Sequence, residues 1–142
     1  MSSDPTTSGA GDPLAPDDLA PDALDPYEPE ITEAYVEAAV AGQRWYWLLL
    51  LKTGPVEDFA EAQSEAIQMA HLRHLFSLQK RGQLTMFGPV RDTRPLRGIG
   101  ILTVETRAEA EALMAEDPWI KAGGMIAEVR PFFTQAGARL PE

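Results

Sequence analysis

The spacing of apolar and polar residues along the chain predicts four strands and two amphipathic helices. Strands are expected at residues 45–51, 84–90, 97–105 and 124–133. Helices are expected at residues 57–81 and 106–117. The resulting order, β-α-β-β-α-β, predicts an α+β, ferredoxin-like fold, in which an antiparallel sheet carries both helices on one face.

The first expected strand is unusual because seven consecutive apolar residues run from Trp45 to Leu51. A run without polar alternation is typical of a strand buried on both faces, or of a central strand with one face at an interface. A single sheet with helices on one side leaves its other face uncovered, and large exposed apolar patches are rare in monomers. We therefore expect a homodimer through this open face, with Trp45 or Trp47 among the buried aromatic residues.

Both histidines of the chain, His71 and His74, fall in the longer helix. At about 100° per residue, His71 lies inside the apolar stripe with Leu75 and Leu78, whereas His74 lies at its edge. A buried imidazole needs a hydrogen-bond partner, and Asp117, before a proline at the end of the second helix, is a candidate. On the residues alone, His71 is either a core histidine held by one hydrogen bond or an acid–base group. No metal site is expected, because the common two-histidine motif uses i, i+4 spacing and a third ligand.

The charge of the chain is concentrated near its N-terminus. Residues 1–43 hold ten acids and no Lys or Arg, whereas the twelve acids and twelve bases of the remainder cancel. Six of the twelve prolines also fall early, so we expect an acidic, Pro-rich disordered tail over residues 1–29. The rest divides into a short helix, the folded domain and a C-terminal tail, at residues 30–43, 44–134 and 135–142. Nucleic acid is not an expected partner, because neither part clusters the Lys and Arg that bind phosphates.

Composition excludes several other classes of chemistry. The chain has no cysteine, which excludes disulfides, zinc–thiolate sites and thiol catalysis. No apolar run reaches the ~18 residues of a membrane-spanning helix, and the N-terminus lacks the basic and apolar regions of a signal peptide. We therefore expect no membrane partner and a cytoplasmic location. No Gly-rich phosphate loop, flavin fingerprint or set of metal ligands is visible, so no cofactor is expected.

Two stretches of the sequence resemble the YciI-like (YCII-related) family. The first, "HLRHLFSLQKRGQLTMFGP", is similar to the family's core pattern at His71, Leu72, Leu75, Leu78, Gly82, Leu84, Gly88 and Pro89. The second, "DPWIKAGGMIAEVRPF", is similar to its later pattern at Asp117, Pro118, Trp119, Lys121, Ala122, Gly123, Arg130, Pro131 and Phe132. The resemblance covers residues 45 to about 133.

The resemblance implies a ferredoxin-like domain that dimerises sheet to sheet, in a dimeric α/β-barrel type of assembly. It also implies a His–Asp acid–base dyad, which maps onto His71 and Asp117. The family includes at least one dehydrochlorinase of aromatic-ring degradation and is similar in fold to muconolactone isomerases. These properties are expectations for the present chain.

Four further residues are expected to contact a substrate beside the dyad: Gln68, Gly88, Pro89 and Trp119. Gln68 stands where the family often has an Arg, so an anionic substrate would lose that partner. Trp119 stands where the family usually has Phe or Tyr, and its larger ring would narrow the pocket.

Two functions follow from these expectations. The first is a cofactor-independent acid–base enzyme of lyase, dehydrohalogenase or isomerase type, acting on a small organic molecule. Asp117 would fix the tautomer of His71, whose other ring nitrogen would abstract a proton. The alternative is a non-catalytic dimeric module that binds a small ligand or has a regulatory role. A folded cleft in which His71 and Asp117 are open to solvent favours the enzyme, and full burial of both with no cavity beside them favours the module.

Overall fold

The chain forms two compact units, Met1–Ala38 and Ala39–Glu142. The structure is a computed structural model that describes residues 11–20 and 27–142. The two units are considered separately, because the fold and the candidate site lie in the second.

The first unit contains little packed structure in its described part. A short 3-10 helix, η1, spans Pro16–Leu19, and helix α1 spans Glu33–Ala41, crossing into the second unit. Thr32 Oγ1 accepts a backbone hydrogen bond of 3.1 Å at the start of α1, so it is the N-cap. Every described residue before Ala39 is exposed. Two stretches of the expected disordered tail lie outside the described residues, 1–10 and 21–26, and that tail stays a prediction.

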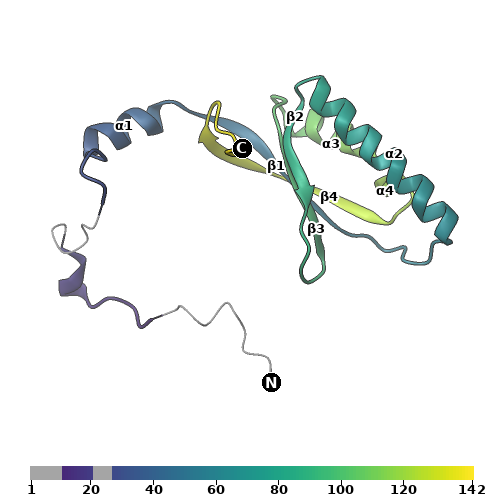
Figure 1. The fold of residues 1–142 in the computed structure, drawn as a ribbon, viewed down its shortest axis with the longest axis horizontal. Helices are drawn as coiled ribbons and strands as arrows, with labels where there is room; N and C mark the ends of the chain where they lie inside the picture. The colour runs from purple at the N-terminus through teal and green to yellow at the C-terminus, as the bar shows by residue number, and fades with distance from the viewer. Residues whose placement is uncertain (1–10, 21–26) are drawn as a thin grey trace. The chain divides into compact units, whose positions relative to one another are not determined.

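The second unit is an α+β fold with a four-stranded antiparallel sheet (Figure 1). Its elements are β1 (Gln43–Thr53), α2 (Glu61–Lys80), β2 (Leu84–Pro89), β3 (Leu96–Leu102), α3 (Arg107–Ala115), α4 (Pro118–Lys121) and β4 (Met125–Gln135). The strand order is β2-β3-β1-β4, as a ferredoxin-like arrangement requires. The one-turn helix α4 is an addition to the sequence-based expectation, and it proves important for the site.

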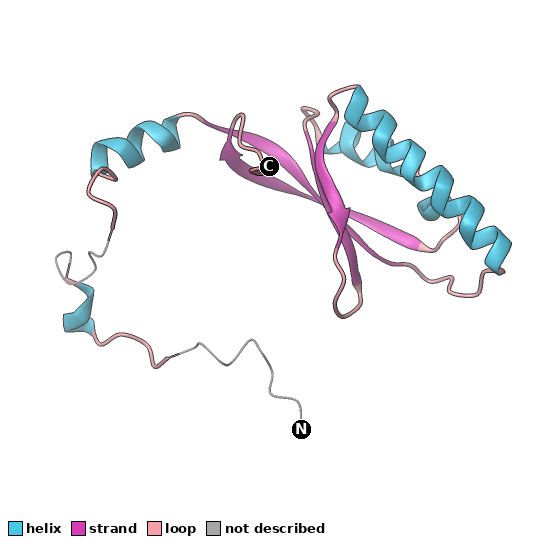
Figure 2. Ribbon diagram, in the orientation of Figure 1, coloured by secondary structure: helices cyan, strands magenta, loops and turns pink. Residues whose placement is uncertain are grey.

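One face of the sheet packs against the helices to form the core (Figure 2). The sheet contributes five buried residues: Leu49, Leu51, Leu84, Leu102 and Val129. Helix α2 adds Leu75 and Leu78, and α3 adds Ala110 and Met114. The buried positions of α2 are His71, Leu75 and Leu78, which confirms the predicted stripe. His71 is thus carried into the core by the spacing that places the two leucines there.

Helix α3 is stabilised at its start by a capping box. Thr106 Oγ1 accepts the backbone N–H of Glu109, and the Glu109 carboxylate accepts the backbone N–H of Thr106. We expect Thr106→Ala to lower the free energy of unfolding by about 1 kcal/mol, because one N–H of the first turn loses its acceptor. Chemical denaturation measures this loss. Thr106→Ser keeps the hydroxyl and is the matched control, so equal destabilisation by both variants would contradict the cap.

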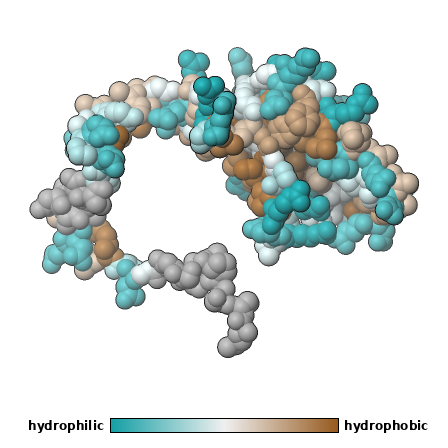
Figure 3. Space-filling model, viewed as in Figure 1, coloured by the Kyte–Doolittle hydropathy of each residue, from teal (hydrophilic) through white to brown (hydrophobic). Residues whose placement is uncertain are grey.

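The open face of the sheet carries the alternate residues of each strand. On β1 these are Tyr46, Leu48 and Leu50, because Leu49 and Leu51 point into the core. Their neighbours on β3 and β4 include Ile99, Ile101, Ile126 and Phe132. Ile99 and Ile126 are 40% and 50% exposed. Hydrophobic residues, in brown, gather at the surface over the strands in Figure 3.

The expectation that Trp45 or Trp47 lines the open face is wrong. Trp47 packs against the core, and the Arg107 guanidinium lies 5.0 Å from the centre of its ring. Trp45 shares that face two residues earlier, where it is 68% exposed and its ring lies tilted against that of Phe133, with 4.7 Å between centroids. The period of two places both tryptophans on one face, but the uninterrupted apolar run holds no polar residue to show which face that is.

A small ionic group interrupts the apolar surface of the open face. Glu128 forms an ion pair with Lys52 at 2.5 Å, and it also accepts hydrogen bonds from Arg130. The hydrogen bond from Lys52, followed by that from Arg130, lowers the pKa of the Glu128 carboxyl below its ordinary value. The open face therefore carries charged side chains, and these are paired with one another within a single chain.

Candidate active site

His71 and Asp117 form a buried pair that joins the middle of α2 to the start of α4. The Nδ1–H of His71 donates to Asp117 Oδ2 at 2.6 Å. The side chain of Asp117 is fully buried, and that of His71 is 7% exposed. The predicted approach of these two residues is confirmed.

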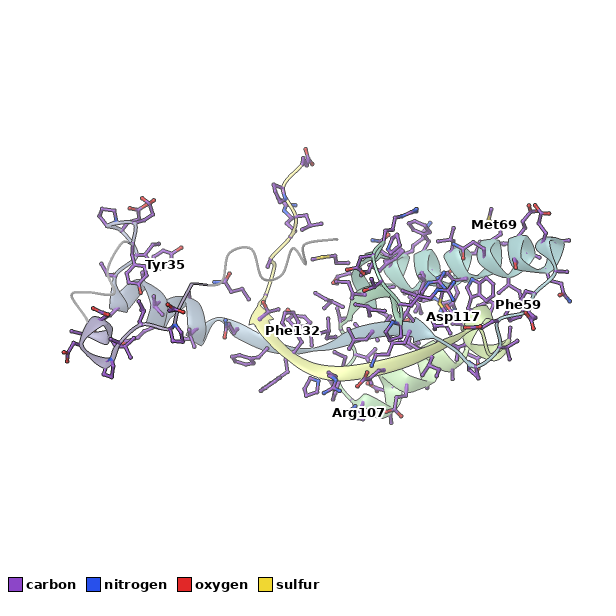
Figure 4. The ribbon with its side chains drawn as sticks, turned by 90° about the horizontal axis from the view of Figure 1, so that it is seen from below. Tyr35, Phe59, Met69, Arg107, Asp117 and Phe132 are labelled. Atoms are coloured by element: carbon purple, nitrogen blue, oxygen red, sulfur yellow. The ribbon has the colours of Figure 1, made fainter. Side chains whose placement is uncertain are left out.

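The other oxygen of Asp117 caps helix α4. Asp117 Oδ1 accepts the backbone N–H of Trp119 at 2.9 Å and that of Ile120 at 3.4 Å. Proline at the first position of α4 suits this turn, because it has no N–H that would need a partner. Both carboxylate oxygens are therefore held, and Figure 4 shows Asp117 beneath α2, whereas Met69 points away on the outer side of that helix. The cap fixes the direction from which the carboxylate meets the imidazole.

The second ring nitrogen of His71 faces accessible space. Among the described residues, Nε2 has no hydrogen-bond partner, and it is not one of the buried polar atoms that lack a partner. His71 also lines a cavity of about 620 Å³ between α2 and the sheet. Ligand pockets commonly have volumes of about 300–1,000 Å³, so a small organic molecule fits this space.

The cavity wall combines apolar and polar surface in similar amounts. It is built from α2, both strands of the β2–β3 hairpin, and the residues of β1 and β4 that face the helices. Gly98 lies on this wall opposite Leu51, where a larger residue would meet Gly88. A Cβ added at Gly98 would lie 3.0 Å from the Gly88 carbonyl oxygen. The hairpin backbone can therefore approach closely at this point.

The structure distributes the other expected substrate contacts unevenly. Gln68, Gly88 and Pro89 lie on the cavity wall together with His71. Trp119 does not line this cavity; its indole N–H donates to Gln68 Oε1 at 2.8 Å, and its ring meets Phe59 edge to face at 5.2 Å. Asp117 likewise stays behind His71, away from the wall. Trp119 is therefore placed to hold Gln68, and Asp117 to position His71.

The cavity residues that were not anticipated from the sequence include Phe76, Phe87, Arg91 and Arg97. The two phenylalanine rings meet edge to face at 5.1 Å between centroids. The two arginines come from a hairpin whose polar loop looked like an ordinary connection. Simple alternation would group Arg97 with Ile99, but the register shifts between Leu51 and Lys52, opposite this part of β3, and that irregularity is not visible in the sequence.

His74 remains outside the pair, as expected. Its Nε2 lies 2.9 Å from the backbone carbonyl oxygen of Leu113, so this ring links α2 to α3. Within the described residues, no three His, Asp or Glu side chains gather closely enough to hold a metal ion. None of the described helices combines the length and apolar character needed to span a bilayer.

Comparison with known proteins identifies the domain. Residues 46–133 match the model of the YCII-related domain family, and no curated protein matches the chain. Among solved structures, the chain is similar to 5-chloro-2-hydroxyhydroquinone dehydrochlorinase (TftG) from Burkholderia phenoliruptrix AC1100, in complex with 2,5-dihydroxybenzoquinone. The two are 21% identical with a TM-score of 0.48, and the match covers 61% of this chain and 92% of that chain. Because the family model spans well over half of the 142 residues, the chain belongs to the YCII-related domain family.

Proposed function

We propose that this protein is a cofactor-independent acid–base enzyme that acts on a small organic molecule. His71 is its proton-transferring residue, and Asp117 is a positioning residue that holds the imidazole. The proposed reaction is proton abstraction followed by elimination or isomerisation, as in a lyase, dehydrohalogenase or isomerase.

One observation carries this proposal: a buried, paired histidine forms part of the wall of a cavity. Asp117 Oδ2 accepts the Nδ1–H of His71 at 2.6 Å, so the lone pair of the neutral ring lies on Nε2. The same side chain lines the 620 Å³ cavity. A histidine that served packing alone would have no need of adjoining space for a ligand.

The pair supports a simple sequence of proton transfers. Nε2 accepts a proton from a C–H or O–H group of the substrate, and the carboxylate of Asp117 stabilises the imidazolium that forms. In an elimination, the electron pair of the broken C–H bond forms a double bond while the leaving group departs with its own pair. In an isomerisation, Nε2 returns the proton to a different atom. Gln68, held by Trp119, supplies a polar contact on the wall.

The alternative, a non-catalytic ligand-binding or regulatory module, is favoured by the burial of Asp117. Its side chain is fully buried and its oxygens are all engaged, as in a structural pair. The cavity beside His71 favours the enzyme over this alternative, because a packing role does not require it.

Assembly forms part of the proposal. We infer a homodimer through the open face of the sheet, because its central strand presents Tyr46, Leu48 and Leu50 to solvent in one chain. Burial of a face of this kind is the simplest way to remove it from water.

The enzyme is tested by removing the ring nitrogen that faces the cavity. We expect His71→Asn to lower kcat/KM by about 10²–10⁴-fold, because its Nδ2–H can still donate to Asp117 while the base at Nε2 is lost. Turnover is found by following C–H signals of small carbon acids, halogenated phenols and lactones by NMR in D₂O.

The matched control for this variant is His74→Gln, whose Nε2 can still reach the Leu113 carbonyl. It should retain wild-type activity. If the wild-type protein exchanges or converts none of these compounds but still binds one of them, the non-catalytic module is the better account. Equal activity of His71→Asn and the wild type would also refute the proposed base.

A further inference from the structure

The charged side chains on the cavity wall are all cationic. Arg91, in the loop after β2, and Arg97, near the start of β3, line the cavity, and none of the described Asp or Glu residues does. Arg97 is half-buried, whereas Arg91 is exposed. The charge of this wall is opposite to that of the whole chain, which carries a net charge of −10.

These two arginines differ in their pairing from a third arginine in the same hairpin. Arg94 forms an ion pair with Glu57 at 3.8 Å and lies outside the cavity wall. The side chains of Arg91 and Arg97 have no ion pair or hydrogen bond with any residue that the structure describes. A guanidinium is a planar fork of N–H donors that binds a carboxylate through two parallel hydrogen bonds. The hairpin therefore places on the cavity wall two arginines whose guanidinium groups have no partner among the described residues.

The remaining wall suits a flat, apolar body. Phe76 and Phe87 line the cavity with their rings at 73° to each other, and leucines of α2 and β1 complete the apolar surface. Aromatic rings favour offset or edge-to-face contact with another planar ring. A ligand with a planar apolar body and one anionic group would satisfy both halves of the wall.

We propose that the cavity binds small planar organic anions, with the Arg97 guanidinium as the carboxylate-binding group. Arg91 adds positive charge at the exposed side, and the phenylalanine rings contact the planar body. This inference deepens the proposed function and rests on it in one respect, that the cavity is the ligand site. The resembling family often has an Arg at the position of Gln68 on α2. In this chain Arg97 on β3 would supply the positive charge instead.

Binding of matched probes to the full chain tests the inference. Benzoate and benzamide share a ring and size but differ in charge, and acetate carries the charge without the ring. We expect benzoate to bind with a Kd of order 1 mM, and benzamide and acetate at least about tenfold more weakly. Calorimetry or amide chemical shifts measure the affinities, and added salt should weaken the two anions, benzoate and acetate, but not benzamide.

Two variants assign the charge preference to a residue. Arg97→Gln should weaken benzoate about tenfold or more and leave benzamide unchanged. Arg94→Gln removes the same charge from the same hairpin, outside the cavity, and should leave benzoate binding intact. Equal affinity for benzoate and benzamide, no binding of either at about 10 mM, or equal weakening by both variants would overturn the inference.

The outcome is separable from that of the proposed function. His71→Asn keeps both cavity arginines, so it should still prefer benzoate to benzamide. If the wild type does not prefer benzoate to benzamide, the anion site is refuted, and the proposed role of His71 as a base is not affected. A preserved preference in a protein without turnover would refute the enzyme and leave the anion site in place.

Discussion

Asp117→Asn is expected to lower kcat/KM by about 10²–10⁴-fold while leaving the fold intact, because it reverses the tautomer of His71. The backbone N–H groups of Trp119 and Ile120 both point at Oδ1. They require an oxygen there, so the amide of the new residue must turn its NH₂ group toward His71. That NH₂ donates to Nδ1, which moves the ring proton to Nε2 and removes the base from the cavity.

This result can be measured without knowledge of the substrate. Long-range ¹H–¹⁵N NMR distinguishes the two neutral tautomers, so the ring of His71 should carry its proton on Nδ1 in the wild type and on Nε2 in the variant. Asn is as good an N-cap as Asp, and we expect a loss of only about 1 kcal/mol in the free energy of unfolding. Asp117→Ala is the comparison, since it removes the cap and leaves buried groups unpaired, and it should cost about 2–4 kcal/mol. An unchanged tautomer in Asp117→Asn would disprove the positioning role.

Leu50→Lys is expected to convert the proposed dimer into a monomer. Leu50 lies on the open face of β1, directly opposite Glu128 on β4, so a single folded chain can accommodate a lysine there. A twofold interface would bury this ammonium group twice, and the cost of desolvating a charge amounts to several kcal/mol. We expect the dimer dissociation constant to rise by at least about 100-fold.

Sedimentation or light scattering at micromolar concentration measures the assembly. Met69→Lys adds the same charge on the outer side of α2, at a side chain that is 60% exposed, and should leave the dimer unchanged. A wild-type protein that is monomeric under these conditions, or a Leu50→Lys protein that remains dimeric, would reject the open face as the interface.

Local periodicity explains what was predicted correctly. The order of strands and helices follows from periods of about 2 and 3.6 residues, which each segment displays by itself. The same periodicity places His71 with Leu75 and Leu78, all three of which are buried in α2. Asp117 was predicted to pair with His71 because a buried imidazole needs a hydrogen-bond partner and because the family pattern places an Asp there. The 2.6 Å contact between the two side chains confirms this pairing.

Features that depend on two segments meeting were missed. The one-turn helix α4 was not anticipated, although its capping Asp and first-turn proline are visible in the sequence. Trp119 was expected in the pocket, but its indole N–H reaches Gln68 across the gap between α4 and α2. That contact depends on how two helices pack, which no single segment encodes.

The sequence by itself thus determined the four strands and two longer helices of the domain, its α+β class and the burial of His71, because hydrophobic spacing within a helix or strand is a local property. Only the tertiary structure decided which face of β1 meets the helices, since seven apolar residues in succession fit either side. It also decided that Arg91 and Arg97 enter the cavity wall while Arg94 pairs with Glu57. The physical reason is that register and packing between distant segments set these contacts, and a one-residue shift would turn each side chain to the other face.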